Sequence, residues 1–388
     1  MIELDNNGVS INPRFCQQCG ACLAVCRQNA IRSERDIKDG LLRIEIDPEK
    51  CVGCKMCFNV CPANKELRIV NVDDYCSSKK YMIGHNKDHE IRRKASSGGI
   101  ARSIIVEGLT SGFFDGVYTL KKSDKYPFAE GCFYTQENAP SFEDIPNSVY
   151  HSVPLNLNMA EIKRCKRLLI VGTPCQLSSL KVFVKNRCEE LYTLCIFCKQ
   201  QKNFKSTRFI AKLAKEKLIS FDDIKSFSYR GNGWPGACEF NGKKVAWGVA
   251  ALMPFGKKLW TVPGCDICGN PFGDDADITV LDPWIIHKTN KLGDNLIVVH
   301  NDKGYNLLAS INCIEFEEMD YSAVESSLMT CDIKRKNRLI DFFQGKESKS
   351  SIIKEGQKFV RKRRILERIL ENTPRLPLVI YKILARII

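Results

Sequence analysis

Eight cysteines near the start of the chain recur in one fixed spacing. The run Cys16-x2-Cys19-x2-Cys22-x3-Cys26 repeats 35 positions later as Cys51-x2-Cys54-x2-Cys57-x3-Cys61. Three thiolates in successive CxxC steps suit one face of an iron–sulfur cubane, whose fourth ligand comes from elsewhere. Eight thiolates could instead hold two zinc ions, but zinc sites usually pair two CxxC knuckles across a longer loop. The spacing therefore favours iron–sulfur clusters.

In this doubled run, residues 10–72 resemble a two-cluster bacterial ferredoxin. The resemblance implies two 4Fe–4S clusters, because the last cysteine of each run in such ferredoxins ligates the other cluster. One cluster would be held by Cys16, Cys19, Cys22 and Cys61, and the other by Cys51, Cys54, Cys57 and Cys26. Proline follows Cys61 as usual, whereas Arg27 follows Cys26, which removes a turn constraint but no ligand.

More cysteines lie beside strand-like runs, at Thr173-Pro174-Cys175, Cys195-x2-Cys198 and Cys265-x2-Cys268. Loops at sheet ends can bring four such thiols together, so the residues predict a third cluster or a zinc site. The isolated cysteines are predicted to pack as small apolar side chains. These are Cys76, Cys132, Cys165, Cys188, Cys238, Cys313 and Cys331.

Two glycine-rich segments could bind a phosphate or a planar ligand. Ser96-Ser97-Gly98-Gly99 precedes a helix-like run, so backbone N–H groups, hydroxyls and a helix N-terminus could hold a pyrophosphate. The same residues also fit an ordinary N-cap, and the upstream Arg92, Arg93 and Lys94 could add charge or form a solvated turn. Residues 230–236 could approach a planar ligand, or form a tight turn plugged by Trp234.

Taken in order, these motifs resemble a known family. They are Ser96-Ser97-Gly98-Gly99, residues 172–176, Phe197-Cys198, Gly233-Trp234, Cys265-x2-Cys268 and residues 276–284. Over about residues 75–330 the chain is similar to the family of beta subunits of coenzyme F420-reducing hydrogenases and dehydrogenases. That family includes 7-hydroxymethyl chlorophyll a reductase and bacterial members of unknown substrate, and some members begin with a ferredoxin module.

The resemblance implies FAD and a third 4Fe–4S cluster. The cluster would be held by Cys175, Cys198, Cys265 and Cys268, with Cys195 as an alternative to Cys198. FAD would be bound by Ser96, Ser97, Gly98, Gly99, Thr173 and Asp282. Lys199-Gln200 replaces the His-Gly that often follows the cysteine aligned with Cys198, which predicts a changed pocket there. Leu281 replaces the glycine before Asp282, which keeps the carboxylate but loses a flexible neighbour.

The patterns predict an α+β chain that begins with the two-cluster ferredoxin-like module, residues 1–72, with strands at 41–47 and 67–70. A polar linker is expected at 73–88. An α/β catalytic region is expected over 73–160 and 161–335, because helix-like runs at 100–106 and 204–218 alternate with strand-like runs. These strand-like runs lie at 116–120, 167–171 and 277–281. The resemblance implies that this catalytic region binds the flavin. Residues 336–388 are expected to form a basic helical tail.

The tail carries much of the excess positive charge. Lys and Arg number 59 against 45 Asp and Glu in the 388-residue chain, and residues 346–388 hold twelve basic and four acidic residues. This placement argues against a nucleic-acid face on the main body. Ile365, Leu366, Ile369 and Leu370 recur at helical spacing, so a basic amphipathic helix could dock on the protein, on a subunit partner or on an anionic membrane.

The overall composition excludes some classes of protein. With 44% hydrophobic and 27% charged residues, the chain is predicted to be globular and not fibrous or disordered. It has no apolar run of eighteen residues and no signal-like start. We therefore expect reduced thiols and a cytoplasmic protein, or one peripheral at a membrane.

These features predict an iron–sulfur flavoprotein oxidoreductase. Cubanes move one electron at a time and a flavin exchanges one or two. Electrons from ferredoxin or another redox protein would therefore reduce coenzyme F420 or another organic substrate, or flow in reverse. The alternative is an electron-transfer subunit of a larger complex with no small-molecule substrate. No side chain is predicted to be the nucleophile.

Overall fold

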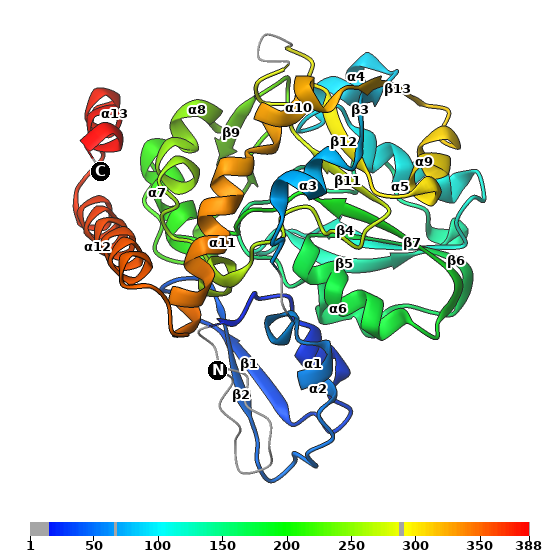
Figure 1. Cartoon of the computed structure of the whole chain (residues 1–388), viewed down its shortest axis with the longest axis horizontal. Helices are drawn as coiled ribbons and strands as arrows, with labels where there is room; N and C mark the ends of the chain where they lie inside the picture. The colour runs from blue at the N-terminus through cyan, green and yellow to red at the C-terminus, as the bar shows by residue number, and fades with distance from the viewer. Residues whose placement is uncertain (1–14, 66–67, 287–290, 388) are drawn as a thin grey trace.

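The computed structural model describes residues 15–65, 68–286 and 291–387, and it shows a mixed α+β chain. Figure 1 shows the cysteine-rich N-terminal module below a larger body, with the C-terminal helices along one side. The body is built around one mixed sheet of eight strands.

The N-terminal module places a hairpin between its two cysteine runs. Helix α1 (Ala21–Val25) and helix α2 (Met56–Val60) each follow a cysteine loop, and β1 (Ile31–Arg35) pairs antiparallel with β2 (Leu42–Ile46). The strand predicted at 41–47 is therefore confirmed. The strand predicted at 67–70 is wrong for Arg68–Val70, because Arg68 makes one isolated bridge to Gly269. Leu67 lies outside the described residues.

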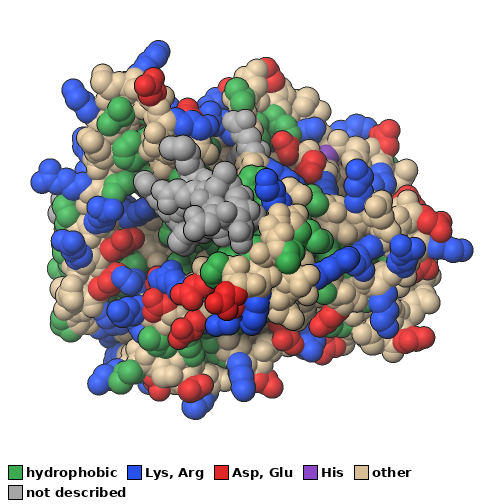
Figure 2. Space-filling model, turned by 90° about the horizontal axis from the view of Figure 1, so that it is seen from below, with side chains coloured by type: hydrophobic (Ala, Val, Ile, Leu, Met, Phe, Trp, Pro, Cys, Tyr) green, Lys and Arg blue, Asp and Glu red, His purple; other side chains and the backbone are tan. Residues whose placement is uncertain are grey.

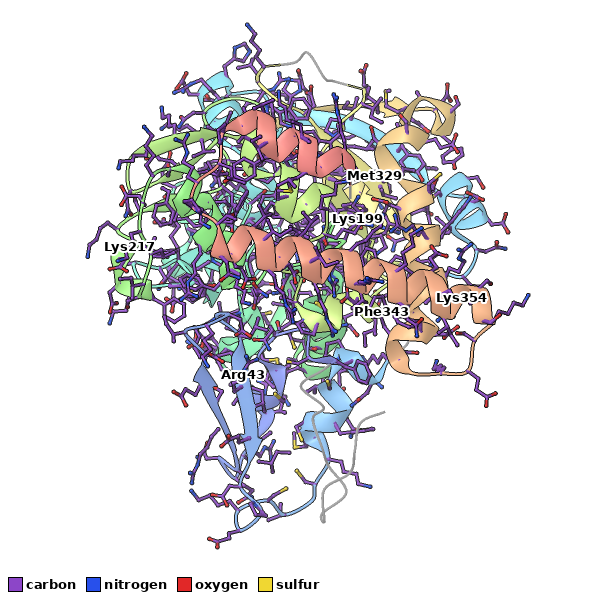
Figure 3. The ribbon with its side chains drawn as sticks, turned by 90° about the vertical axis from the view of Figure 1, so that its left-hand side faces the viewer. Arg43, Lys199, Lys217, Met329, Phe343 and Lys354 are labelled. Atoms are coloured by element: carbon purple, nitrogen blue, oxygen red, sulfur yellow. The ribbon has the colours of Figure 1, made fainter. Side chains whose placement is uncertain are left out.

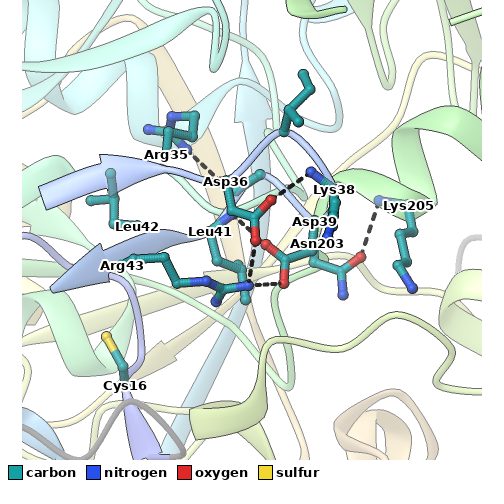
Figure 4. Close-up of polar contacts among 12 residues, drawn as sticks. Cys16, Arg35, Asp36, Lys38, Asp39, Leu41, Leu42, Arg43, Asn203 and Lys205 are labelled. Carbon is teal, nitrogen blue, oxygen red and sulfur yellow. Dashed lines mark hydrogen bonds and ion pairs between the residues drawn. The ribbon is translucent and has the colours of Figure 1, made fainter. Parts of the chain in front are cut away.

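The hairpin turn anchors this module to the body (Figure 4). Arg43 pairs with the carboxylates of Asp36 and Asp39 at 3.1 and 2.5 Å, and the carbonyl of Asp39 accepts a hydrogen bond from the backbone N of Phe204 at 2.6 Å. Gly40 has a φ of 70°, and a Cβ there would lie 2.6 Å from the Cβ of Phe204. Glycine is therefore required for this close approach.

The large sheet has parallel strands in its centre and antiparallel strands at its flanks. The order is β13-β3-β12-β11-β7-β6-β4-β5, and β11, β7, β6 and β4 run parallel. The bounds are β3 (Lys80–Asn86), β4 (Gly116–Lys122), β5 (Ala129–Tyr134), β6 (Cys165–Gly172), β7 (Cys188–Ile196), β11 (Ile278–Leu281), β12 (Asn295–Val299) and β13 (Ile314–Met319). The strands predicted at 116–120, 167–171 and 277–281 are thus confirmed.

The linker predicted at 73–88 is wrong. Residues 73–88 instead include most of helix α3 (Val72–Ser77) and strand β3, which pairs with β12 and β13. Tyr81, Met82 and Ile83 are buried there by layers on both faces of the sheet. The apolar run of β3 is only Tyr81-Met82-Ile83, followed by Gly84 and His85, which is shorter than the continuous run by which a strand buried on both faces is recognised.

Helices cover both faces of the sheet. Helices α5 (Ile100–Thr110) and α9 (Asp302–Ala309) pack on one face around Leu169, Leu194 and Ile297. Helices α6 (Pro174–Val184), α3 and α10 (Tyr321–Leu328) pack on the other, around Leu168, Ile170 and Leu296. The helix predicted at 100–106 corresponds to α5. Between β3 and α5 lies the short α4 (His89–Lys94).

A second apolar cluster joins the tail to a small antiparallel sheet. It contains α7 (Phe204–Leu213), β8 (Phe227–Ser228), β9 (Ala237–Phe240), β10 (Lys243–Ala246) and α8 (Trp247–Ala250). Helix α11 (Thr330–Gln344) leads to the tail helices α12 (Ser350–Asn372) and α13 (Leu378–Ile387), which confirms a helical tail. Figure 3 shows α12 and α13 lying across one face of the molecule.

Basic and acidic side chains are interspersed on the face seen from below (Figure 2). Among the helices in the described ranges, none has the length and apolar character needed to cross a membrane.

Candidate redox site

The eight cysteines of the module gather in two groups. Burial raises the pKa of Cys22, and the neighbouring sulfurs of Cys19, Cys16, Cys61 and Cys57 raise it further. Burial also raises the pKa of Cys57, whose sulfur neighbours are Cys26, Cys54 and Cys51. Apart from Cys57 beside Cys22, these neighbours belong to the crossed ligand sets that the resemblance to ferredoxin implies. We call Cys16, Cys19, Cys22 and Cys61 the first thiol group, and Cys51, Cys54, Cys57 and Cys26 the second.

Burial makes the first thiol group costly to ionise without a metal. It raises the pKa of Cys16 to about 11 and that of Cys61 to about 12. A bound metal removes the proton from a coordinating thiol, so loading these sites would release protons. In the described part of the chain, no three His, Cys, Asp or Glu side chains converge as ligands of a single metal ion. In a cubane, each thiolate binds a different iron atom.

A third thiol group forms where strands of the large sheet end. Cys175 lies in the first turn of α6, after β6, and Cys198 lies just after β7, which is the parallel neighbour of β6. Cys265 and Cys268 come from the short segment 263–268. Burial raises the pKa of Cys175, and the sulfurs of Cys268, Cys198 and Cys19 add to that rise. The structure therefore brings Cys175, Cys198, Cys265 and Cys268 together.

Cys195, the alternative to Cys198, lies within strand β7 and is fully buried. Its environment differs from that of the third thiol group. Burial raises the pKa of Cys195, the side chain of Thr279 lowers it, and the sulfur of Cys198 raises it by a smaller amount. Of the two cysteines, Cys198 has sulfur neighbours at both Cys265 and Cys268.

A cavity of about 970 Å³ connects the third thiol group with the Ser-Ser-Gly-Gly loop. Its wall includes Ser96, Ser97, Gly99, Thr173 and Asp282, together with Cys198, Cys265 and Cys268. This volume lies at the upper end of the range for small-molecule and cofactor sites. Five of the six predicted FAD residues therefore line one cavity.

Gly98, the sixth, does not line the cavity. A Cβ on Gly98 would lie 2.6 Å from the carbonyl O of Gly84 and 2.7 Å from the N of Asn295. Gly99 caps α5 with a φ of 85°. The two glycines therefore let the loop press against β3 and β12. The Oγ of Ser96 accepts a hydrogen bond from the backbone N of Ser148 at 2.8 Å.

The basic residues upstream of this loop have partners and do not line the cavity. Arg92 is buried and pairs with Asp294 at 2.8 Å, Arg93 pairs with Glu90, and Lys94 pairs with Glu143. They therefore fix local structure around the loop.

Asp282 is held by an ion pair. Its Oδ2 lies 2.5 Å from Nη1 of Arg230, whose side chain is fully buried, and its Oδ1 accepts a hydrogen bond from Nε1 of Trp234 at 3.1 Å. Burial lowers the pKa of Arg230, but the Asp282 carboxylate and the Tyr150 side chain together raise that pKa above its ordinary value. Of the two interpretations of residues 230–236, this geometry fits the turn plugged by Trp234.

Thr173 caps helix α6 and also lies beside a candidate ligand. Its side chain and that of Gln176 form a capping box, and its Oγ1 lies 3.4 Å from Sγ of Cys175. This hydroxyl therefore links the cavity wall to the third thiol group.

The opposite wall of the cavity was not predicted from the sequence. Tyr150, Trp247 and Phe255 supply aromatic surface, with the Tyr150 and Trp247 rings stacked at 5.1 Å between centroids. Phe359 and Arg363 of α12 complete the wall. Trp284, in the last of the family motifs, was the one available sequence signal for an aromatic wall.

The tail is packed on the body, and part of its apolar surface stays exposed. Leu366 and Leu370 are buried, and Arg363 makes a two-point ion pair with Asp266 at 2.9 and 2.8 Å. Ile365 and Ile369, predicted on the same apolar face, are exposed. On α13, Val379 and Ile383 are also exposed, with 57% and 44% of their surface accessible.

Matches to known families agree with this arrangement. Residues 81–155 match the N-terminal model, and residues 165–322 the C-terminal model, of coenzyme F420 hydrogenase/dehydrogenase, beta subunit. Residues 15–65 match a 4Fe-4S dicluster domain, which supports iron–sulfur clusters in the module.

Individual relatives are distant. An uncharacterized protein of Methanocaldococcus jannaschii is 22% identical over 68% of this chain and 79% of its own length. One subunit of the F(420)H(2) dehydrogenase of Methanosarcina mazei is 24% identical over 45% of this chain and 50% of its own length. The chain thus spans about half of that subunit.

Among solved structures, a chain of the F420-reducing NiFe hydrogenase complex of Methanosarcina barkeri matches with a TM-score of 0.50 and 18% identity. The match covers 70% of this chain and 92% of that one, and it supports the fold. The two matching regions and the shared fold show that the chain belongs to the family of coenzyme F420 hydrogenase/dehydrogenase beta subunits, a family of oxidoreductases, and carries a 4Fe–4S dicluster domain at its N-terminus.

Proposed function

We propose that the chain is an iron–sulfur flavoprotein that passes electrons between its clusters and FAD to reduce or oxidise coenzyme F420 or another organic substrate. The first and second thiol groups would hold two clusters and the third thiol group a third cluster. Three cysteines of the third thiol group line the same cavity as the Ser-Ser-Gly-Gly loop, and this observation carries the proposal.

The polar groups that line the cavity are suited to binding a flavin. Oδ1 of Asn147 and Oε1 of Gln201 are buried without a hydrogen-bond partner in the described structure, and both residues line the cavity. A buried acceptor without a partner is costly, so a ligand that donates N–H groups would be favoured there. The Trp247 and Trp284 side chains offer apolar surface to a planar ring.

The protein would position and tune these cofactors. When bound, FAD supplies the exchange between single electrons and hydride. The Ser-Ser-Gly-Gly loop would hold its phosphates with the Ser96 hydroxyl and backbone N–H groups, because the Ser97 hydroxyl already donates to the carbonyl O of Asp294. The backbone N of Gln201 donates a hydrogen bond to Sγ of Cys265 at 3.3 Å, and such bonds set cluster potential.

Cofactor content of the full chain tests this proposal. Anaerobic purification should give about twelve irons and one flavin per chain, as three cubanes and one FAD require. Cys198→Ser should leave about eight irons, because it removes a ligand of the third cluster. Cys195→Ser is the matched control and should keep about twelve. A colourless wild-type protein that carries zinc would overturn the proposal.

The alternative is an electron-transfer subunit without a substrate of its own. It is favoured by relatives that are themselves subunits, such as the coenzyme F420 hydrogenase subunit beta of Methanococcus voltae. Turnover of the isolated chain with reduced viologen and coenzyme F420 separates the two functions. Consumption of the acceptor without a partner protein would exclude the subunit role.

The tail would provide a contact at the outer surface. Exposed Val379 and Ile383 on α13 lie beside exposed Lys382 and Arg386, and α12 carries exposed Arg364 and Arg368. Exposed apolar side chains and exposed cations on the same tail match the composition of a surface that binds anionic lipid. We propose a peripheral contact of this surface with an anionic membrane.

A further inference from the structure

Helix α6 lies between the first and third thiol groups. Cys175 stands in its first turn, and Ser179 follows four residues later on the same face of the helix. Ser179 is fully buried, and its Oγ lies 3.8 Å from Sγ of Cys19 and 3.4 Å from the carbonyl O of Cys175. One hydroxyl therefore contacts a cysteine from each group.

Backbone hydrogen bonds fix this approach. The backbone N of Asn156 donates to the carbonyl O of Cys19 at 2.9 Å, and its side-chain Nδ2 donates to the carbonyl O of Gln176 at 3.0 Å. One asparagine thus ties the first thiol group to α6. On the other side, the N of Gly264, next to Cys265, donates to the carbonyl O of Cys16 at 3.2 Å.

The second thiol group lies nearer to the solvent than the first. Cys54 is exposed, whereas Cys19 and Cys175 are buried. The first thiol group therefore lies on the side of the module that meets the body, and Ser179 is a side chain of the body that contacts one of its cysteines.

We propose that Ser179 is a positioning residue that sets the reduction potential of the cluster bound by the first thiol group. This inference rests on the proposed function. The Ser179 hydroxyl donates its one hydrogen to the carbonyl O of Cys175 when Cys19 is a neutral thiol. When Cys19 is a thiolate ligand, its sulfur is a charged acceptor and the stronger partner, so the hydroxyl turns and donates that hydrogen to the sulfur instead. A hydrogen bond to a ligand sulfur stabilises the more negative, reduced cluster and so raises its potential.

The test compares Ser179→Ala with Ser178→Ala in the full, anaerobically purified chain. Ser178 is the adjacent residue on α6, and within the described ranges no hydrogen bond of its side chain is found, so it controls for a helix substitution. A redox titration followed by electron paramagnetic resonance should show one cluster that is harder to reduce in Ser179→Ala. We expect its equilibrium constant for one-electron reduction to fall by up to about tenfold, or about 59 mV. Ser178→Ala should match the wild type.

Each other outcome is decisive. Equal potentials in the two variants, or loss of iron from Ser179→Ala, would overturn the inference, because Ser179 would then be inert or only structural. A wild-type chain with about eight irons would refute the third cluster of the proposed function. The shift at the first thiol group would still be measured in that chain, so the two failures are distinguishable.

Discussion

Replacing Asp282 by asparagine should destabilise the body more than any loss of a surface charge. Arg230 has no exposed side-chain surface, and Asp282 has 17%. Asparagine can still accept the hydrogen bond from Nε1 of Trp234, but it cannot neutralise Arg230. Asp282→Asn therefore leaves a buried guanidinium without its counterion.

The expected loss follows from this burial. Removing one partner of a buried ion pair costs about 3–5 kcal/mol, and the partial exposure of Asp282 places the loss near about 3 kcal/mol. With an unfolding entropy of about 2.1 cal/mol/K per residue over roughly 300 residues of the body, the melting temperature should fall by about 5 °C.

Differential scanning fluorimetry under nitrogen measures this change, with flavin and iron content checked in each protein. Glu143→Gln removes an exposed carboxylate that pairs with Lys94 and should change the melting temperature little. Arg230→Met combined with Asp282→Asn should be less destabilised than the two single losses added together, by at least about 1 kcal/mol. Additive losses, or a shift no larger than that of Glu143→Gln, would refute the reasoning.

Three further changes test other parts of the chain. Cys54→Ala should lower iron from about twelve to about eight per chain and destabilise the module; a fully loaded variant would contradict the ligand assignment. Burial lowers the pKa of His151 to about 4. Since the unfolded chain binds this proton below about pH 6.5, stability should fall as the pH drops from about 6.5 toward 4. His151→Gln should lessen that fall in urea-unfolding midpoints, and an identical acid response would exclude His151 as its source. Arg364→Glu with Arg368→Glu should reduce sedimentation with vesicles rich in anionic phospholipid, while unchanged sedimentation would contradict the membrane contact.

Short apolar runs in the sequence predicted several strands of the large sheet. The runs that became β4, β6 and β11 are mostly apolar, as expected for strands buried on both faces. The predicted helix at 204–218 was too long, because α7 ends at Leu213 and Lys215 adopts a left-handed φ of 61°. Strand β3 was missed because its partner β12 lies more than 200 residues later in the chain.

In the candidate site, too, the features with a local sequence signal were predicted and those that depend on tertiary packing were not. Cysteine spacing predicted the two thiol groups of the module, because neighbouring loops fix both. That Asp282 faces Arg230, 52 residues earlier, depends on tertiary packing and has no local signal. The contribution of α12 to the cavity wall depends on where the tail packs, which its amphipathic pattern does not specify.

Helix α12 lies beyond residue 322, where the match to the shared family region ends, yet Phe359 and Arg363 border the chamber. A portion of the binding surface is thus supplied by an appendage that the common scaffold does not constrain. The size and charge of this part of the cavity therefore depend on how α12 docks, as well as on the region that the family model matches.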